Sequence, residues 1–70
     1  MKLATLMKSN TIQGDIRLSV WNEYGEEIEV KYLNCVDNLA CEPSAKNWKN
    51  KNVSFIFAPG DGFLHIELSE

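Results

Sequence analysis

The sequence predicts an α+β domain, a short N-terminal helix packed on a four-stranded antiparallel sheet built from two hairpins. Two stretches predict the hairpins, because residues 12–33 and 53–68 each hold two runs of alternating apolar and polar residues around a turn that contains Gly. The spacing of apolar residues at 2–9 predicts the helix. With 70 residues, the chain is expected to form a single domain, residues 1–70.

The N-terminal helix is predicted from one apolar face. Leu3, Leu6 and Met7 recur at positions i, i+3 and i+4 of the stretch KLATLMKS. Two helical turns are not stable alone, so this helix is expected to lean on the sheet. The competing interpretation is that these residues start a strand.

The first hairpin has a register that follows from its loop length. A four-residue loop would oppose Val20 to Glu27, whereas a three-residue loop at 23–25 opposes Val20 to Ile28. The three-residue loop is a type I turn followed by a left-handed residue, and Gly25 occupies the position that needs positive φ. The predicted pairs are Val20–Ile28, Leu18–Val30 and Ile16–Tyr32.

The second hairpin folds over the turn Pro-Gly-Asp-Gly at residues 59–62, whose residue types favour tight turns. One face of the predicted hairpin is wholly apolar, with the pairs Phe57–Leu64, Phe55–Ile66 and Val53–Leu68. The other face carries the pairs Ala58–Phe63, Ile56–His65 and Ser54–Glu67. Because this second face keeps several apolar groups, we expect it to be partly covered or to touch a partner.

The helix and the apolar strand faces together predict one core. Its members are Leu3, Leu6, Ile16, Leu18, Val20, Ile28, Val30, Tyr32, Val53, Phe55, Phe57, Leu64, Ile66 and Leu68. The segment between the hairpins, residues 34–52, is the least regular part, and a structureless loop of this length is unusual in a compact domain. We therefore expect a short helix or 3₁₀ turn at 36–41, interrupted by Pro43.

Composition and charge narrow the class of protein. The apolar fraction of 44% is ordinary for a globular domain, and the net charge of −3 argues against general binding to a phosphate backbone. The same charge fits an acidic protein that docks on a basic surface. No apolar run approaches the ~20 residues that span a membrane, and the apolar patch after Lys2 is too short for a signal peptide. A cytoplasmic protein without a membrane partner is expected.

Residues with catalytic or metal-binding chemistry are few. His65 is the only histidine, and no spacing around it predicts a metal site or a catalytic partner, so a structural or surface role is expected. Cys35 and Cys41 have the wrong spacing for a C-x-x-C motif and are interpreted as buried free thiols, with a strained disulfide as the alternative. The sequence also lacks the phosphate-binding, nucleophile-elbow and zinc-protease motifs. It therefore predicts no enzyme activity, no metal and no cofactor.

Acidic and aromatic residues outside the predicted core form the leading candidate site. Glu27 and Glu29 share one strand face in the predicted alternation, which is either simply solvated or an acidic interaction surface. A contiguous group of exposed aromatic residues marks an interface, unless the helix, the loop or a second copy covers it. The leading hypothesis is a non-enzymatic module that binds a host protein. Its candidate contact residues are Trp21, Glu23, Tyr24, Glu27, Glu29, Trp48, Ile56 and Phe63.

Two other functions fit parts of the sequence. The segment AKNWKNKN places Lys46, Lys49 and Lys51 around Trp48, a pattern that binds single-stranded nucleic acid by stacking and phosphate contact. The net charge disfavours this function, and Trp48 can instead cap the open end of the core while the lysines are solvated. The remaining alternative is a structural homo-oligomer, such as a homodimer.

The chain contains, in this order and with the segment 34–52 outside them, the four stretches KLATLMK, DIRLSVWNEYG, VSFIFA and LHIEL. In this order they resemble small proteins encoded by phages, prophages and mobile elements of Gram-positive bacteria. These motifs are structural, so no functional residues carry over. The resemblance implies a small accessory protein that acts by binding, in the manner of phage-encoded inhibitors of host enzymes or host defence, anti-CRISPR proteins among them.

Overall fold

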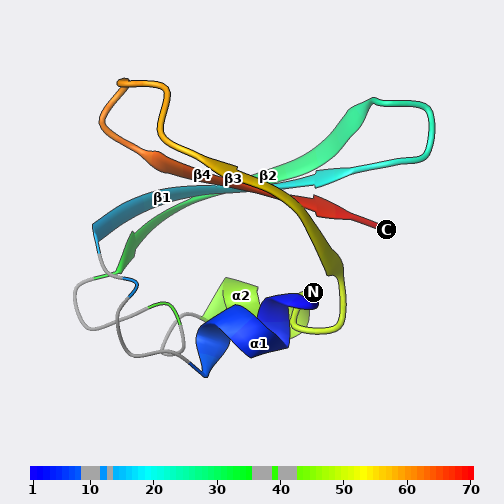
Figure 1. Cartoon of the computed structure of the whole chain (residues 1–70), viewed down its shortest axis with the longest axis horizontal. Coiled ribbons are helices and arrows are strands. Elements are labelled where there is room, and N and C mark those ends of the chain that lie inside the picture. Colours follow the sequence, from blue (N-terminus) through cyan, green and yellow to red (C-terminus); the bar gives the residue numbers. More distant parts are fainter. Residues whose placement is uncertain (9–11, 13, 36–38, 40–42) are drawn as a thin grey trace.

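The four strands form one sheet, and both helices lie on the same face of it (Figure 1). The computed structural model describes residues 1–8, 12, 14–35, 39 and 43–70. Its elements are α1 (Leu3–Met7), β1 (Gly14–Trp21), β2 (Glu27–Cys35), α2 (Pro43–Asn47), β3 (Asn52–Phe57) and β4 (Leu64–Ser69). The α+β class, the short N-terminal helix and the four-stranded sheet are therefore confirmed.

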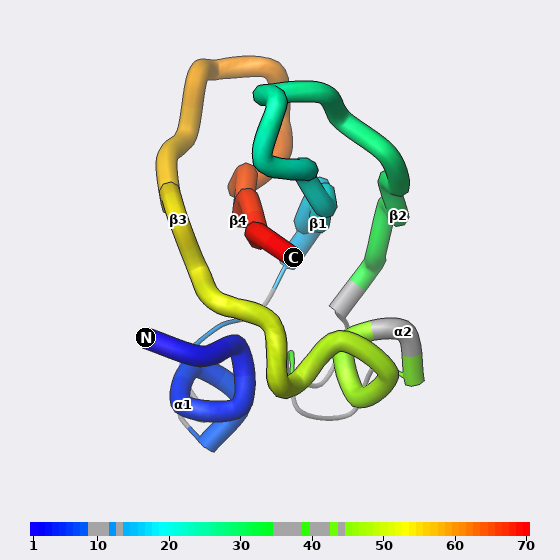
Figure 2. Tube along the Cα trace, turned by 90° about the vertical axis from the view of Figure 1, so that its right-hand side faces the viewer, coloured from blue at the N-terminus to red at the C-terminus, as the bar shows by residue number. Residues whose placement is uncertain are grey.

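The sheet is mixed, so the prediction of a purely antiparallel sheet is wrong. Its strand order is β2-β1-β4-β3, in which β1 is antiparallel to β2, β3 is antiparallel to β4, and the central strands β1 and β4 are parallel. A parallel pair needs a crossover connection. Here α2 belongs to the connection between the two edge strands and lies beneath the sheet beside α1 (Figure 2). The strands are thus not two simple hairpins placed side by side.

The parallel contact aligns the apolar residues of the two central strands. The pairs are Ile16–Leu64, Leu18–Ile66 and Val20–Leu68. Both apolar triplets repeat every second residue, so they can face the same side of the sheet whichever way the strands run. Sequence alternation therefore predicts the shared face and leaves the strand direction open.

The turn between β1 and β2 has the predicted loop. The backbone N–H of Asn22 donates to the carbonyl oxygen of Glu26 at 2.9 Å, which encloses residues 23–25. Gly25 has a φ of +76°, as the left-handed position of this loop requires. The Asn22 side-chain oxygen accepts hydrogen bonds from the backbone N–H groups of Tyr24 (2.9 Å) and Glu26 (3.0 Å), so the turn is closed on itself.

A β-bulge follows this turn and changes the register of β1 and β2. Trp21 pairs with Glu27, but Val20 pairs with Glu29, so Ile28 is the additional residue. The predicted pairs Val20–Ile28, Leu18–Val30 and Ile16–Tyr32 are wrong; the observed pairs are Val20–Glu29, Leu18–Lys31 and Ile16–Leu33. A shift of one residue exchanges the two faces of a strand. Leu33 therefore lies on the core side, and Tyr32 and Val30 lie on the opposite side.

A second bulge has the same effect on β3. The predicted pair Val53–Leu68 is confirmed, but the register shifts between Val53 and Phe55. The next pairs are Phe55–Glu67, Ile56–Ile66 and Phe57–His65, which replace the predicted Phe55–Ile66, Phe57–Leu64, Ile56–His65 and Ser54–Glu67. Phe55 and Phe57 consequently lie on the face away from the helices.

The core lies between the sheet and the two helices. Its buried apolar residues are Leu3, Ile16, Leu18, Val20, Leu33, Leu39, Ala45, Ile66 and Leu68, and Leu6, Val53 and Leu64 pack against them as predicted. Four predicted core residues are exposed instead, namely Ile28, Tyr32, Phe55 and Phe57, and Val30 is half-buried on the far face. Leu33, Leu39 and Ala45 were not predicted.

The connection between β2 and β3 contributes α2, which the sequence did not predict. Pro43 was expected to interrupt a helix, but it starts one, because proline suits the first helical position. The short helix or 3₁₀ turn predicted at 36–41 lies outside the described residues except for Leu39. Leu39 is in a 3₁₀ turn, in agreement with the second alternative, and donates its N–H to the Ile12 carbonyl oxygen at 2.9 Å. The predicted free thiols likewise lie outside the described side chains. Within the described residues, no helix is long and apolar enough to cross a membrane.

Candidate functional site

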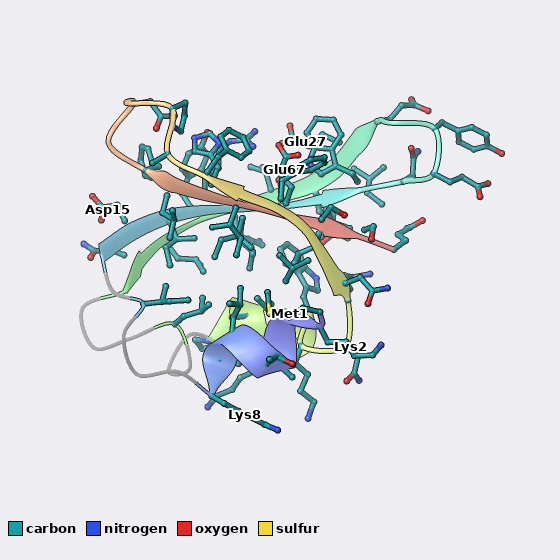
Figure 3. All side chains as sticks on the ribbon, in the orientation of Figure 1. Met1, Lys2, Lys8, Asp15, Glu27 and Glu67 are labelled. Atoms are coloured by element: carbon teal, nitrogen blue, oxygen red, sulfur yellow. The ribbon has the colours of Figure 1, made fainter. Side chains whose placement is uncertain are left out.

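The face of the sheet that the helices leave uncovered is the candidate site, and we call it the open face. Its side chains lie in three rows that follow the strand register. The rows are Tyr32–Arg17–His65–Phe57, Val30–Ser19–Glu67–Phe55 and Glu27–Trp21–Ser69–Asn52. Figure 3 shows Glu27 and Glu67 on this side of the sheet, opposite the helices.

Aromatic rings cover much of the open face. Tyr32, Phe55 and Phe57 are 60%, 63% and 41% exposed. The Tyr32 ring meets the edge of the Phe63 ring at 5.1 Å between centroids, and the Phe57 ring lies 5.0 Å from the His65 ring. These contacts orient the Tyr32 and Phe57 rings against their neighbours.

Arg17 lies in the middle of the first row, and its charge is paired with a carboxylate of the protein. Its guanidinium is 2.6 Å from a Glu27 carboxylate oxygen, and its Nε donates to the Tyr32 hydroxyl oxygen at 3.2 Å. The pKa of Arg17 is raised above its ordinary value, first by the hydrogen bond with Tyr32 and also by Glu27. The only arginine of the chain is therefore committed to Glu27 and Tyr32.

His65 has a carboxylate partner at the end of the same row. Its Nε2 is 2.7 Å from one Asp61 oxygen, and the other Asp61 oxygen accepts the backbone N–H of Phe63 at 3.0 Å. These bonds lower the pKa of Asp61, with His65 as the larger cause. The pair closes the turn between β3 and β4 onto the open face.

Trp21 stands in the third row between two hollows of the surface. Its indole N–H donates to the hydroxyl oxygen of Ser19 at 3.0 Å, and Ser19 is fully buried, so the ring is held in place. One hollow, of about 260 Å³, is lined by Trp21, Asn22, Glu23, Gly25, Ser54, Phe55, Glu67 and Ser69. The other, of about 460 Å³, is lined by Trp21, Asn22, Glu23, Tyr24, Ser69 and Glu70.

Among the described residues, acidic and basic side chains are concentrated in different elements. The acidic residues of the described part all lie in the sheet, its turns or the C-terminus; they are Asp15, Glu23, Glu26, Glu27, Glu29, Asp61, Glu67 and Glu70. Five of the six lysines lie in or beside the helices, namely Lys2, Lys8, Lys46, Lys49 and Lys51. Figure 3 shows Lys2 and Lys8 on the helix side.

The structure brings only some of the predicted contact residues together. Trp21, Glu27 and Phe63 lie on the open face, and Glu23 and Tyr24 lie in the adjoining turn. The first bulge separates Glu27 from Glu29, which pairs with Val20 on the helix side, so the prediction that they share a face is wrong. Ile56 pairs with Ile66 on the helix side and Trp48 packs on the core.

The lysines predicted to bind nucleic acid surround the end of α2. Lys46 and Lys49 are exposed, while Trp48 is half-buried against the core. The carbonyl oxygens of Lys49 and Lys51 accept the N–H groups of Ala4 and Leu3, so this segment anchors α1.

Sequence reasoning placed Arg17 away from the core but did not name it as a contact residue, and it assigned Tyr32, Phe55 and Phe57 to the core. The available signal was the run Val53–Phe57, which carries large apolar residues on both strand faces and therefore specifies its own register poorly. Among the described residues, no group of three or more His, Cys, Asp and Glu is placed to hold a metal ion. Comparison with protein-family models, curated proteins and solved structures gives no match.

Proposed function

We propose that the protein is a non-enzymatic interaction module that docks its open face on a basic surface of a partner protein. The observation that carries the proposal is an uncovered sheet face on which exposed aromatic rings lie among carboxylates. Tyr32, Phe55 and Phe57 supply the rings, and Glu27, Glu67 and Asp61 supply the carboxylates.

The aromatic rings would supply the affinity. Aromatic residues dominate the binding energy of protein interfaces, and monomeric proteins rarely expose large contiguous apolar patches without a function. The rings on this face belong to three different strands and to the turn before β4, so docking would bury them together.

The carboxylates would select the partner. Acidic side chains around an aromatic patch favour a basic surface, speed encounter and disfavour acidic partners. Because the charges of Arg17 and Glu27 largely cancel in their ion pair, the negative potential of this face comes from the remaining carboxylates, Glu67 and Asp61. As a phage-encoded inhibitor of a host or defence protein, which the resemblance implies, the module would occlude a basic site such as one that holds nucleic acid.

Photo-crosslinking from neighbouring positions of β2 tests the proposal. Tyr32 faces the open side and Lys31 the helix side, so benzoylphenylalanine at either position probes opposite faces of the same strand. In lysate of the host cell, we expect one basic protein to crosslink from position 32, less at high salt, and not from position 31. Equal crosslinking from both positions, or none from either at low salt, would refute the proposal.

A second candidate function is nucleic-acid binding through the helix side. The clustering of lysines there favours it, with Lys46 and Lys49 exposed for phosphate contacts. A short single-stranded oligonucleotide should then quench Trp48 fluorescence in a Trp21→Phe variant at low salt, and salt should reverse the quenching. Unchanged Trp48 emission at low salt would eliminate this candidate.

A further inference from the structure

We propose that the two hollows beside Trp21 receive an arginine side chain of the partner. This inference rests on the proposed function, because the arginine belongs to the surface on which the open face docks. It goes further by assigning a binding site and the chemical group that fills it. We call the ten residues that line the two hollows the Trp21 corner.

The Trp21 corner combines carboxylates with aromatic rings and contains no positive charge. Its carboxylates are Glu23, Glu67 and Glu70, its rings are Trp21, Tyr24 and Phe55, and no lysine or arginine lines either hollow. Within the described part of the chain, Glu67 takes part in no ion pair, whereas Glu27 is paired with Arg17. A positively charged group of a ligand would therefore complement this corner.

The side chains that line the corner favour arginine over lysine. A guanidinium is planar, stacks on aromatic faces and binds a carboxylate through two parallel hydrogen bonds, whereas an ammonium is a strongly hydrated point charge. Trp21 provides the best ring for a cation–π contact, and Glu67 and Glu23 both line the hollow of about 260 Å³.

Two parts of the corner, the Trp21 ring and the backbone of the adjoining turn, are held by hydrogen bonds within the protein. The indole N–H of Trp21 is bonded to buried Ser19, and the Asn22 side chain fixes the backbone N–H groups of the adjoining turn. Preorganised walls lower the entropic cost of ordering a ligand. The Trp21 ring and this turn are thus the fixed part of the proposed pocket.

Peptide titration of the whole protein tests this assignment. The probes are Gly-Arg-Gly, Gly-Lys-Gly and the uncharged isostere Gly-citrulline-Gly, with blocked ends. Trp21 emission is followed in a Trp48→Phe variant, and amide chemical shifts are followed in the unmodified protein. We expect the arginine peptide to shift Trp21 emission and the amides of residues 22–25, 54–55 and 67–69. The lysine peptide should bind several-fold more weakly and the citrulline peptide should not bind.

Charge variants make the test specific. Glu67→Gln should weaken arginine-peptide binding about tenfold, as expected for the loss of a charged hydrogen-bond acceptor. Glu29→Gln removes the same charge from the helix side of the sheet and should leave binding unchanged. Equal weakening by both variants, equal binding of the three peptides, or no binding of any peptide would overturn the assignment.

The outcomes separate this inference from the proposed function. Partner crosslinking from position 32 that Glu67→Gln leaves unchanged would keep the open-face docking and refute the arginine pocket. Arginine-peptide binding that Glu67→Gln weakens, without any crosslinked partner, would keep the pocket and refute the docking.

Discussion

Arg17 organises the open face through contacts that cross two strands. It joins Tyr32 and Glu27 of β2 from its place on β1, and its guanidinium carbon lies 5.8 Å from the centre of the Tyr32 ring. The ion pair with Glu27 and the hydrogen bond with Tyr32 explain how Arg17 is accommodated among the aromatic side chains of the open face. They also place Tyr32, one of the proposed contact residues, in a fixed position.

At Gly25, backbone conformation alone determines which residue types the position tolerates. Its φ is +76°, and a Cβ added there would meet no atom within 4 Å, so a side chain is opposed by strain and not by space. We expect Gly25→Val to lower the free energy of unfolding by about 1–2 kcal/mol, and Gly25→Asn to lower it by less, because Asn tolerates the left-handed region. Urea unfolding measures both. An equal loss for Val and Asn would contradict the conformational explanation.

Asp61 predicts a dependence of stability on acid. Its pKa lies below the ordinary value of 3.8 because His65 and then the Phe63 N–H bond its carboxylate. A carboxylate with a lowered pKa stabilises the fold above the unfolded value, and that contribution is lost as the pH falls through the folded pKa. We therefore expect Tm to fall as the pH drops below 3.8 and Asp61→Asn to remove part of this fall.

The control for Asp61 is Asp15→Asn, which changes an exposed carboxylate at the start of β1. It should leave the acid dependence of Tm as in the wild type. Wild-type behaviour in Asp61→Asn would show that the pair with His65 contributes nothing.

Among the elements, each of the two edge strands contains a β-bulge. In each strand the bulge shifts the register by one residue, so that Tyr32 on β2 and Phe55 and Phe57 on β3 lie on the open face instead of the core side. Bulges commonly re-aim side chains at sheet edges and near functional sites. The open face owes most of its aromatic character to these two bulges.

The register of β2 can be tested by two neighbouring truncations. Leu33 is 7% exposed and Tyr32 is 60% exposed, so Leu33→Ala should lower the free energy of unfolding by about 2–4 kcal/mol and Tyr32→Ala by no more than about 1 kcal/mol. Denaturant unfolding of both variants gives the comparison. A larger loss of stability for Tyr32→Ala than for Leu33→Ala would instead support the predicted register, which has no bulge.

At the scale of the whole molecule, the described charges are unevenly distributed among the elements. The carboxylates lie in the sheet, its turns and the C-terminus, with Glu29 on the helix side, and five of the six lysines lie in or beside the helices. Such an uneven distribution orients a protein as it approaches a charged partner and raises the association rate. The carboxylate-rich elements are therefore expected to lead when the partner is basic.

Paired charge removal on the two sides distinguishes the two candidate functions. Under open-face docking, replacing Glu23 and Glu67 by Gln should slow partner association about tenfold at low salt, and replacing Lys46 and Lys49 by Gln should not. Under nucleic-acid binding, only the lysine variant should lose oligonucleotide quenching of Trp48. Stopped-flow mixing measures the first effect and fluorescence titration the second.

Much of the fold could be predicted from particular residues. Leu3 and Leu6 predicted α1, the alternation of Ile16, Leu18 and Val20 predicted the buried side of β1, and Gly25 predicted the first turn. These signals are local, since each depends on spacing within one element or on the φ preference of one residue.

The candidate site could be predicted only in part for the same reason. Trp21, Glu27 and Phe63 were predicted and lie on the open face, whereas Tyr32, Phe55 and Phe57 were assigned to the core. A stretch such as Val53–Phe57 has large apolar residues on both faces, so composition cannot tell which face is buried.

By itself, the sequence determined the α+β class, the positions of the four strands, the N-terminal helix and the closing of the first turn. Only the tertiary structure decided that β1 and β4 are parallel, that α2 lies under the sheet, and that both edge strands are bulged. The physical reason is that alternation and turn preference act within a few residues. Strand direction and register depend instead on contacts between residues far apart in the sequence, which local alternation does not specify.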